Sequence, residues 1–320
     1  MEVGNVSEFK VPPVTLILTI NGRETIWLLA DRRLSSKARA PRDDARKVMF
    51  LETTDGVAIL GYAGLGATAL GTEPADWMSG VLRGRDLRLE QSLGALAGAM
   101  SRQFPQHMTH LRGDGGRAHL VIITSFVDSQ ARLYTIELVC RPDGRTCECR
   151  CTRHIVEAPT LAAHRTPRVA MAGTGATYLI GRKDWRRSLL HVIGACDRRQ
   201  VSPHTVADQL ARLNYEVSQG ISDESVGPRC VVAWRHSRKG VHKGGGAHQF
   251  YTGSDRESNM PSLPSIASGM DIEALSGMML PLVLKAVEST QAGEPPGDLD
   301  LDELDTQLAL LPDEPDEDLP

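Results

Sequence analysis

The most strongly patterned stretch of the sequence runs from Val14 to Lys47 and reads VTLILTINGRETIWLLADRRLSSKARAPRDDARK. Residues 16–20 and 25–29 are apolar and rich in branched side chains, a composition that favours β-strands. Asn21–Gly22 lies between them and favours a tight type I′ turn, because both residue types tolerate positive φ. We therefore expect a β-hairpin near the start of the chain.

Three polar residues lie at equal intervals in this stretch. Thr15 opens the first expected strand, Asp31 ends the second, and Lys47 precedes a further apolar strand; two steps of sixteen residues separate them. A hydroxyl is a weak nucleophile unless nearby groups take its proton or lower its pKa. The free α-amino group of an N-terminal threonine is such a group, and a positively charged lysine held nearby favours the deprotonation.

This arrangement resembles the proteasome β-subunit group of N-terminal-nucleophile (Ntn) hydrolases. The resemblance rests on the spacing of the three polar residues, on Asp31-x-Arg33, and on the Ala63–Gly64 pair that follows the expected strand 56–61. It continues more weakly to about Trp234. The resemblance implies an α+β fold, a four-layer αββα sandwich, and self-association into rings.

The resemblance also implies an activity, the hydrolysis of amide bonds in peptide or protein substrates. Removal of residues 1–14 would free the α-amine of Thr15, whose ordinary pKa of about 7.7–8.0 suits a general base for its own hydroxyl. Lys47 would favour deprotonation, Asp31 would orient Lys47, and the Gly64 N–H would stabilise the oxyanion. The implied catalytic residues are Thr15, Asp31, Lys47, Gly64, Thr174 and Asp223, and the implied substrate-binding residues are Arg33, Ser35 and Tyr62.

Two positions depart from the pattern of that group. Val14 stands where the group has glycine before its nucleophile, and a β-branched residue crowds the carbonyl that self-cleavage must attack. Val226 stands where the group has a supporting serine, so one hydroxyl is missing. These departures favour an alternative, a catalytically silent assembly or interaction protein that retains its N-terminal segment. Both hypotheses stay open at this point.

The remaining elements follow an order that is not the strict alternation of a doubly wound fold. Two strands, two helices, four strands, two helices and one strand succeed one another, which favours two packed sheets covered by helices. The expected strands are 47–51, 57–61, 117–127, 132–140, 147–157, 168–172 and 230–235, and the expected helices are 67–82, 89–104, 185–196 and 203–218.

The ends of the chain differ in composition from its centre. We expect residues 1–14 to be an extension or propeptide, 15–236 the folded domain, and 237–292 an extension with a helix near 271–288. Residues 293–320 carry eleven acidic residues and no Lys or Arg, while the rest of the chain has a net charge of +7. Such a tail is typical of disordered, solubilising segments. Alternatively, its leucines between 299 and 311 could bind a partner as a short helix.

Several function classes find no support in the sequence. No signal peptide and no apolar run of about 20 residues occurs, which predicts a cytoplasmic protein without membrane contact. Aromatic residues are only 4% of the chain, and the basic surplus is not interleaved with them, which argues against nucleic-acid binding. No Walker A or H-E-x-x-H pattern occurs, so no cofactor is predicted.

A cluster of cysteines leaves three interpretations open. Cys147, Cys149 and Cys151 alternate along one expected strand, with Cys140 across a turn. C-x-C-x-C lacks the usual spacing of structural zinc sites. The alternatives are a metal site, reduced structural cysteines, and a Cys140–Cys147 disulfide.

Overall fold

The computed structural model of the chain describes residues 6–9, 15–36, 39–64, 72–107, 119–140, 147–154, 168–182, 184–239, 244–257, 263–291 and 306. Within these residues it contains two seven-stranded sheets, a small two-stranded sheet and six helices. The prediction of an α+β chain with two sheets is confirmed.

The first sheet is built around the hairpin of β2 and β3. Its strand order is β1-β11-β2-β3-β12-β13-β14, antiparallel except for the parallel pair β1 and β11. Its strands are β1 (Val6–Phe9), β2 (Ile17–Asn21), β3 (Thr25–Asp31), β11 (Arg168–Ala172), β12 (Cys230–His236), β13 (Gly245–Thr252) and β14 (Asp255–Arg256).

The second sheet is a meander of five antiparallel strands with a short hairpin added at one edge. Its order is β10-β9-β8-β7-β6-β15-β16, and β15 pairs with β6 in parallel. Its strands are β6 (Val48–Glu52), β7 (Gly56–Ala63), β8 (Leu120–Val127), β9 (Gln130–Cys140), β10 (Cys147–His154), β15 (Ser265–Ala267) and β16 (Met270–Asp271). A separate hairpin joins β4 (Leu34–Ser36) to β5 (Arg39–Arg42).

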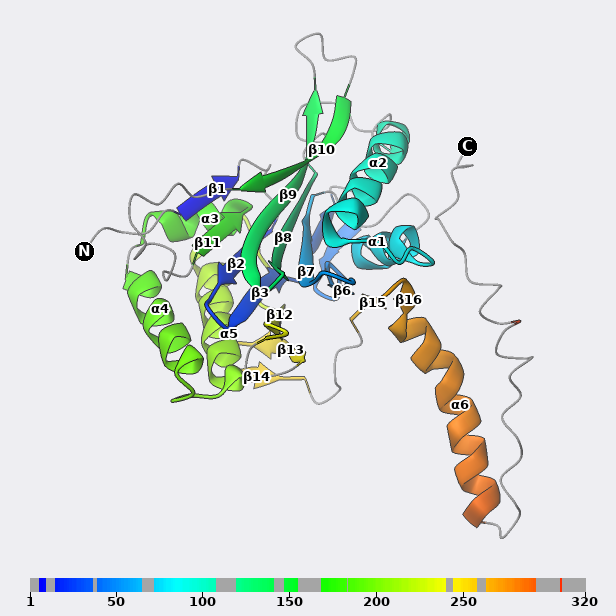
Figure 1. Cartoon of the computed structure of the whole chain (residues 1–320). Coiled ribbons are helices and arrows are strands. Elements are labelled where there is room, and N and C mark those ends of the chain that lie inside the picture. The colour runs from blue at the N-terminus through cyan, green and yellow to red at the C-terminus, as the bar shows by residue number, and fades with distance from the viewer. Residues whose placement is uncertain are drawn as a thin grey trace.

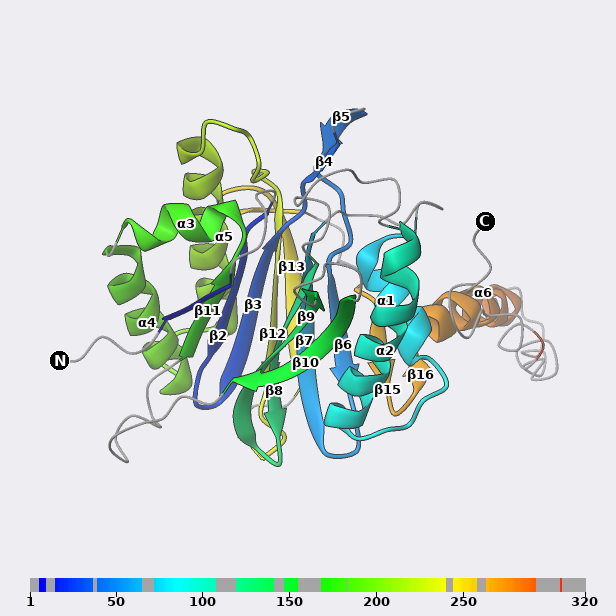
Figure 2. The same cartoon turned by 90° about the horizontal axis from the view of Figure 1, so that it is seen from above.

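The helices lie on the outer faces of the two sheets. Figure 2 shows α3, α4 and α5 beside the first sheet and α1 and α2 beside the second, with the sheets facing each other between them. α6 lies beyond α1 and α2 and extends away from the body of the molecule (Figure 1). The helices are α1 (Pro74–Leu82), α2 (Leu89–His107), α3 (Thr174–Ile180), α4 (Asp184–Asp197), α5 (Pro203–Gly220) and α6 (Ile272–Gln291).

Three apolar clusters hold these layers together, and the alternation of side chains along the strands sorts residues among them. In β3, Leu28 packs between the sheets, whereas Trp27 and Leu29 face α3, α4 and α5. In β7, Ile59 faces the first sheet and Leu60 faces α1 and α2. Strands buried on both faces read as continuous apolar runs, which explains the composition of residues 16–20 and 25–29.

The turn of the first hairpin differs from the type I′ turn that we expected. Asn21 pairs with Ile26 inside the ladder, and the N–H of Gly22 donates to the carbonyl of Thr25 (2.9 Å). None of the residues 21–24 has positive φ, which a type I′ turn requires. Asp197 of α4 holds the turn open because its carboxylate accepts the N–H groups of Arg23 (3.1 Å) and Glu24 (3.4 Å).

Other elements differ from the expected ones. No strand was expected over residues 34–42, which form β4 and β5, or over residues 245–252, which form β13 within the expected extension. No helix was expected over residues 174–180, where α3 begins at Thr174. The expected start of the first helix, residues 67–71, lies outside the described residues, and α1 begins at Pro74.

The N-terminal segment contributes to the first sheet. We expected residues 1–14 to lie outside the core, yet Val6–Phe9 pair in parallel with residues 169–172 of β11 as the edge strand β1. Residues 10–14 lie outside the described residues, and Val14, one of the two residues joined by the Val14–Thr15 bond, is among them. Whether the segment is removed stays a prediction.

The cysteine strand packs against a helix. Cys149 and Cys151 of β10 are free thiols that pack on the apolar cluster under α1 and α2. Strand register places Cys147 opposite Cys140, but their side chains lie outside the described part of the chain. Among the described residues, no three His, Cys, Asp or Glu side chains are grouped to hold a metal ion. No described helix is both long and apolar enough to cross a membrane.

Candidate active site

Thr15, Asp31 and Lys47 meet at one end of the first sheet. Strand pairing of β2 with β3 sets Leu16 beside Asp31, and the Asp31 N–H donates to the Leu16 carbonyl (3.0 Å). This register brings the side chain of Thr15, the residue before Leu16, to the Asp31 carboxylate. Lys47 reaches the same point from the residue before β6 in the second sheet.

The hydroxyl of Thr15 lies between the carboxylate and the amine. Thr15 Oγ1 donates a hydrogen bond to Asp31 Oδ1, and Lys47 Nζ donates to Thr15 Oγ1 (3.1 Å). Lys47 Nζ also lies 3.4 Å from Asp31 Oδ1. A carboxylate oriented to accept the proton and an ammonium oriented to stabilise the resulting alkoxide are the groups that turn a hydroxyl into a nucleophile.

Burial strengthens the interactions in this trio. Thr15, Asp31 and Lys47 are 2%, 0% and 4% exposed, so few water molecules screen their charges. Burial lowers the pKa of Lys47, while the charge and hydrogen bond of Asp31 act in the opposite direction; the net direction is downward. An amine with a lowered pKa gives up its proton more readily than a surface lysine, so Lys47 can both stabilise an alkoxide and accept a proton.

Asp31 is fixed by main-chain donors as well as by the trio. Its Oδ1 accepts the Leu16 N–H (2.8 Å), and its Oδ2 accepts the N–H groups of Arg33 (3.0 Å) and Gly227 (3.5 Å). Hydrogen bonds from several N–H groups hold a buried carboxylate in one orientation. The Asp31 carboxylate is therefore held in place, and both the Thr15 hydroxyl and the Lys47 amine contact it.

Arg33 has its guanidinium engaged by other residues of the chain. It forms a bidentate pair with Asp43 (2.7 and 2.8 Å) and donates to the carbonyl of Glu224 (2.8 Å). The hydrogen bond with Asp43 raises the pKa of Arg33 despite partial burial. The carbonyl of Arg33 accepts from Lys47 Nζ (2.6 Å), so this residue orients the lysine through its backbone. Substrate binding by its side chain stays a prediction.

The other two predicted substrate-binding residues, Tyr62 and Ser35, make no described contact with the trio. Tyr62 packs in the apolar cluster between the second sheet and the helices α1 and α2, and its hydroxyl is hydrogen-bonded to Nδ1 of His119 (2.5 Å). That placement gives no support to a role in lining a pocket at Thr15. Ser35 belongs to β4, but its side chain lies outside the described residues.

Thr174 lies between two glycines that touch Thr15. The N–H of Gly175 lies 3.3 Å from the carbonyl oxygen of Thr15, and a Cβ on Gly173 would clash with the same oxygen. The hydroxyl of Thr174 is buried and has no hydrogen-bond partner among the described residues. A buried hydroxyl without a partner costs stability. A supporting role for Thr174 beside the nucleophile stays a prediction.

No described contact joins Asp223 or Gly64 to the trio of Thr15, Asp31 and Lys47. Asp223 is exposed and accepts the N–H of Ser225 (2.9 Å). Gly64 directly follows β7, and residues 65–71 beyond it lie outside the described part of the chain. The supporting role of Asp223 and the oxyanion role of Gly64 stay predictions.

The comparisons with known proteins correct the resemblance stated above. No family model matches the chain, and no curated protein matches it. The solved structures that match include an Anbu (Gly-1) mutant from Hyphomicrobium sp. strain MC1 (11% identity, TM-score 0.39, 71% of this chain and 89% of that one). Anbu, an ancestral beta-subunit, from Yersinia bercovieri matches with 12% identity and a TM-score of 0.42 over 84% of this chain and 96% of that one.

A third similar structure is a helical assembly of the Anbu complex from Pseudomonas aeruginosa, with 13% identity and a TM-score of 0.44 over 70% of this chain and 82% of that one. All three are Anbu proteins, a family distinct from the proteasome β-subunits, so the assignment to the β-subunit group was wrong. At TM-scores below 0.5, these likenesses say nothing about the activity of this chain.

Sequence reasoning missed residues that only the tertiary structure brings to the trio. Asn214, fully buried on α5, donates to the carbonyls of Gly227 (3.0 Å) and Pro228 (3.2 Å) and so positions the N–H that reaches Asp31. Ser225 is buried two residues earlier, and its hydroxyl has no partner among the described residues. Ser225 thus supplies a hydroxyl one position before Val226, which packs in the apolar cluster under α5. No spacing in the sequence indicates the contacts of Asn214 or the burial of the Ser225 hydroxyl.

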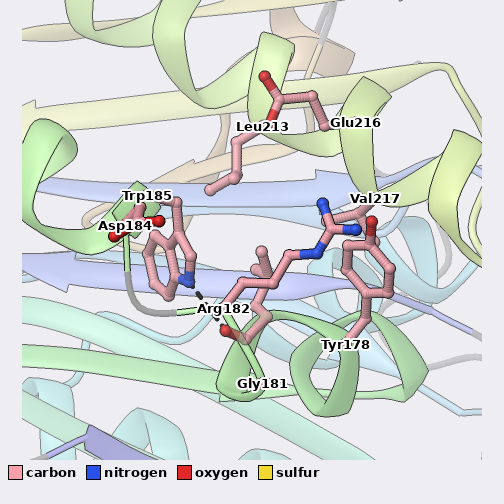
Figure 3. A pocket seen from close by; sticks show the side chains of 9 residues that line it. Tyr178, Gly181, Arg182, Asp184, Trp185, Leu213, Glu216 and Val217 are labelled. Carbon is pink, nitrogen blue, oxygen red and sulfur yellow. Dashed lines mark hydrogen bonds between the residues drawn. The ribbon is translucent and has the colours of Figure 1, made fainter.

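A cavity lies away from the trio. A cavity of about 510 Å³ opens between α3, α4 and α5, where Tyr178, Arg182 and Trp185 form one wall and Leu213, Glu216 and Val217 lie opposite (Figure 3). The Arg182 guanidinium lies over the Tyr178 ring, 4.5 Å from its centroid. None of the predicted site residues lines this cavity.

Proposed function

We propose that this chain is a threonine-type Ntn hydrolase of amide bonds, with peptides or proteins as substrates and Thr15 as nucleophile after residues 1–14 are removed. The observation that carries the proposal is the placement of Thr15 Oγ1 between Asp31 Oδ1 and Lys47 Nζ. Two stacked sheets with helices on both outer faces support the four-layer αββα arrangement of this enzyme class.

The first reaction is an internal one. Thr15 Oγ1 attacks the carbonyl carbon of Val14, and its proton passes to Asp31 or to Lys47 in its neutral form. The C–N bond between Val14 and Thr15 then breaks as the new amine is protonated, which leaves residues 1–14 as an ester on the threonine. Water hydrolyses the ester, releases the segment, and leaves Thr15 with a free α-amine.

Substrate hydrolysis would repeat this chemistry on another chain. The free α-amine takes the hydroxyl proton, and the Lys47 ammonium stabilises the oxygen that attacks the substrate carbonyl carbon. The substrate C–N bond then breaks, its amine leaves with the proton held by the α-amine, and the acyl group stays on Thr15 as an ester. Water attacks the acyl-enzyme, with the amine again accepting a proton. The buried hydroxyls of Thr174 and Ser225, which have no hydrogen-bond partner among the described residues, are our candidates to hydrogen-bond the new amine.

The experiment measures the intact mass of the purified protein and of Thr15→Ala. Self-cleavage predicts a species that comprises residues 15–320 in the wild type and only full-length chain in the variant. Thr15→Ser is the matched control, because it keeps a hydroxyl and should still cleave. A full-length wild type that persists through prolonged incubation, and that no β-lactone probe acylates, would overturn the proposal.

A second candidate is a catalytically silent assembly protein that retains its N-terminal segment. The observations that favour it are the nearly complete burial of Thr15 and the pairing of Val6–Phe9 with β11 in the intact chain. Self-association belongs to both candidates and is independent of the chemistry. The mass measurement separates the two, because only the hydrolase loses residues 1–14.

A further inference from the structure

Arg32 lies in the chain between the two residues that orient the trio. Its neighbour Asp31 accepts the hydrogen bond of Thr15, and the carbonyl of its other neighbour, Arg33, accepts that of Lys47 Nζ (2.6 Å). The N–H of Arg33 also donates back to Asp31 Oδ2 (3.0 Å). Any movement of Arg32 would therefore move both a carboxylate and a carbonyl that contact the trio.

Main-chain hydrogen bonds hold Arg32 from two sides. Its N–H donates to the carbonyl of Arg229 (3.0 Å), and its carbonyl accepts the N–H of Ala45 (3.0 Å). Arg229 directly precedes β12, and Ala45 lies between β5 and β6. Segments far apart in the sequence thus meet at this one residue.

The side chain of Arg32 is buried among three acceptors. Its Nη1 donates to Gln249 Oε1 (2.9 Å) and to Glu257 Oε1 (3.0 Å), and its Nη2 donates to the Asp44 carbonyl (3.1 Å). The side chains of Arg32 and Glu257 are only 10% and 13% exposed. Burial lowers the pKa of Arg32, and the charge of Glu257 acts most strongly in the opposite direction. Because a guanidinium stays charged in proteins, Glu257 compensates a charge that water scarcely reaches.

Two of these acceptors come from the β13–β14 hairpin, beyond residue 236 where we expected the folded domain to end. Gln249 belongs to β13 and Glu257 directly follows β14. The Glu257 N–H donates to the Gln249 carbonyl (2.9 Å), so the two acceptors are held together. β13 pairs with β12, and β12 pairs with β3, the strand that ends at Asp31. The hairpin therefore reaches the candidate active site from the edge of the first sheet.

We propose that Glu257 is a positioning residue for the chemistry at Thr15. Its ion pair holds Arg32 and, through the main chain, holds the Asp31 carboxylate and the Arg33 carbonyl at the trio. This inference rests on the proposed function, and it adds that a hairpin outside the expected domain is needed for the full rate.

The residue before Glu257 offers a matched control. Arg256 forms a bidentate ion pair with Asp208 of α5, with both carboxylate oxygens 2.8 Å from Nη2. It belongs to the same hairpin and has no described contact with Arg32. Arg256→Gln therefore weakens the attachment of the hairpin and leaves the charge of Arg32 compensated. Glu257→Gln keeps the size of the side chain and removes that compensation.

The first test follows cleavage of the Val14–Thr15 bond over time by intact mass, in the full-length wild type, Glu257→Gln and Arg256→Gln. A displacement of about 1 Å at reacting groups can cost about 100-fold in rate, so we expect Glu257→Gln to cleave at least tenfold more slowly. Arg256→Gln should cleave at the wild-type rate. Circular dichroism checks that each variant is folded under the assay conditions. Equal rates in the wild type and Glu257→Gln, or equal slowing in both variants, would overturn the proposal.

A double variant separates positioning from a general loss of stability. Glu257 acts through Arg32 in this proposal, so Glu257→Gln should slow cleavage no further once Arg32→Met is present. Two residues that merely stabilise the fold would instead contribute independently, and their effects on the rate would multiply. A further tenfold slowing by Glu257→Gln in the Arg32→Met protein would overturn the proposal.

A third measurement does not depend on cleavage. Hydrogen exchange of the Arg33 N–H, which donates to Asp31, is measured by NMR in full-length Thr15→Ala protein. We expect Glu257→Gln to speed this exchange at least tenfold and Arg256→Gln to leave it unchanged. If this difference appears but the wild type never cleaves itself, the proposed function fails while the link from Glu257 to Asp31 stands. Unchanged exchange in Glu257→Gln would overturn the positioning role itself.

Discussion

Gly173 lies so close to Thr15 that a Cβ atom on it would be 2.0 Å from the Thr15 carbonyl oxygen. Gly173 also has a φ of 90°, in the region that favours glycine. Gly173 lies at the start of α3, and Thr15 carries the candidate nucleophile. Their close contact therefore restricts the position of the Thr15 backbone.

Gly173→Ala should consequently damage both stability and chemistry. Backbone strain of about 1–2 kcal/mol and overpacking of about 1–3 kcal/mol predict a loss of roughly 2–5 kcal/mol in the free energy of unfolding. Urea denaturation measures this loss. Gly84→Ala is the control, because Gly84 has a φ of 74° but no atom within 4 Å of an added Cβ, so only the strain should appear. Equal losses in the two variants would refute the steric account.

Asp31 and Lys47 should depend on each other for stability. Removal of one partner leaves a buried charge uncompensated, which costs about 3–5 kcal/mol, whereas removal of both costs less than the sum. Urea unfolding of Asp31→Asn, Lys47→Met and the double variant gives the coupling free energy. Additive losses would show that the two charges do not stabilise each other.

The attachment of α6 should weaken in acid. Burial alone would raise the pKa of Asp271, but hydrogen bonds from the Ala274 N–H, Arg83 and Ser79 outweigh it, and the pKa is lowered. A lowered folded-state pKa contributes stability that is present above the unfolded value of about 3.9 and is lost as the pH falls through the folded value. The stability difference between wild type and Asp271→Asn should therefore be constant above about pH 5 and shrink below about pH 4. A difference that persists at pH 2 would contradict this.

The buried thiols should resist alkylation in the folded protein. Burial raises the pKa of Cys149 to about 12 and that of Cys151 to about 11, and it raises the pKa of the fully buried Cys230 as well. Because the thiolate is the reactive form, iodoacetamide at pH 8 should leave Cys149 and Cys230 unmodified until urea unfolds the chain. Peptide mass spectrometry before and after unfolding measures this. Rapid labelling of Cys230 in the native protein would contradict its burial.

The sequence predicted those parts of the structure that depend on local pattern. The strands around Thr15, Asp31 and Lys47 formed with the expected spacing because continuous apolar runs specify strands buried on both faces. The hairpin turn was wrong because Asp197, far away in sequence, binds its N–H groups. The same reason hides Asn214 and Gly227, which reach Asp31 only after α5 has packed on the sheet.

The family assignment failed for a different reason. A threonine, an aspartate and a lysine at regular spacing describe a chemical arrangement, and several families can share such an arrangement while their chains differ elsewhere. Tyr62 illustrates the point, since strand alternation directs its side chain to α1 and α2 and not to the trio. Residue roles transferred by position need the direction of the side chain, which the spacing alone does not supply.

The edge strand β1 gives removal of the N-terminal segment a second effect. Val6–Phe9 occupy the border of the first sheet, and they precede the bond that self-cleavage would cut. Their departure would uncover a row of unpaired N–H and C=O groups along β11, and an open sheet edge is a template for the addition of another strand. Removal of residues 1–14 would thus expose the β11 edge at the same moment as it frees the α-amine of Thr15. The shortened chain would then need a binding partner that covers this edge, because otherwise the edge could pair with other exposed strands.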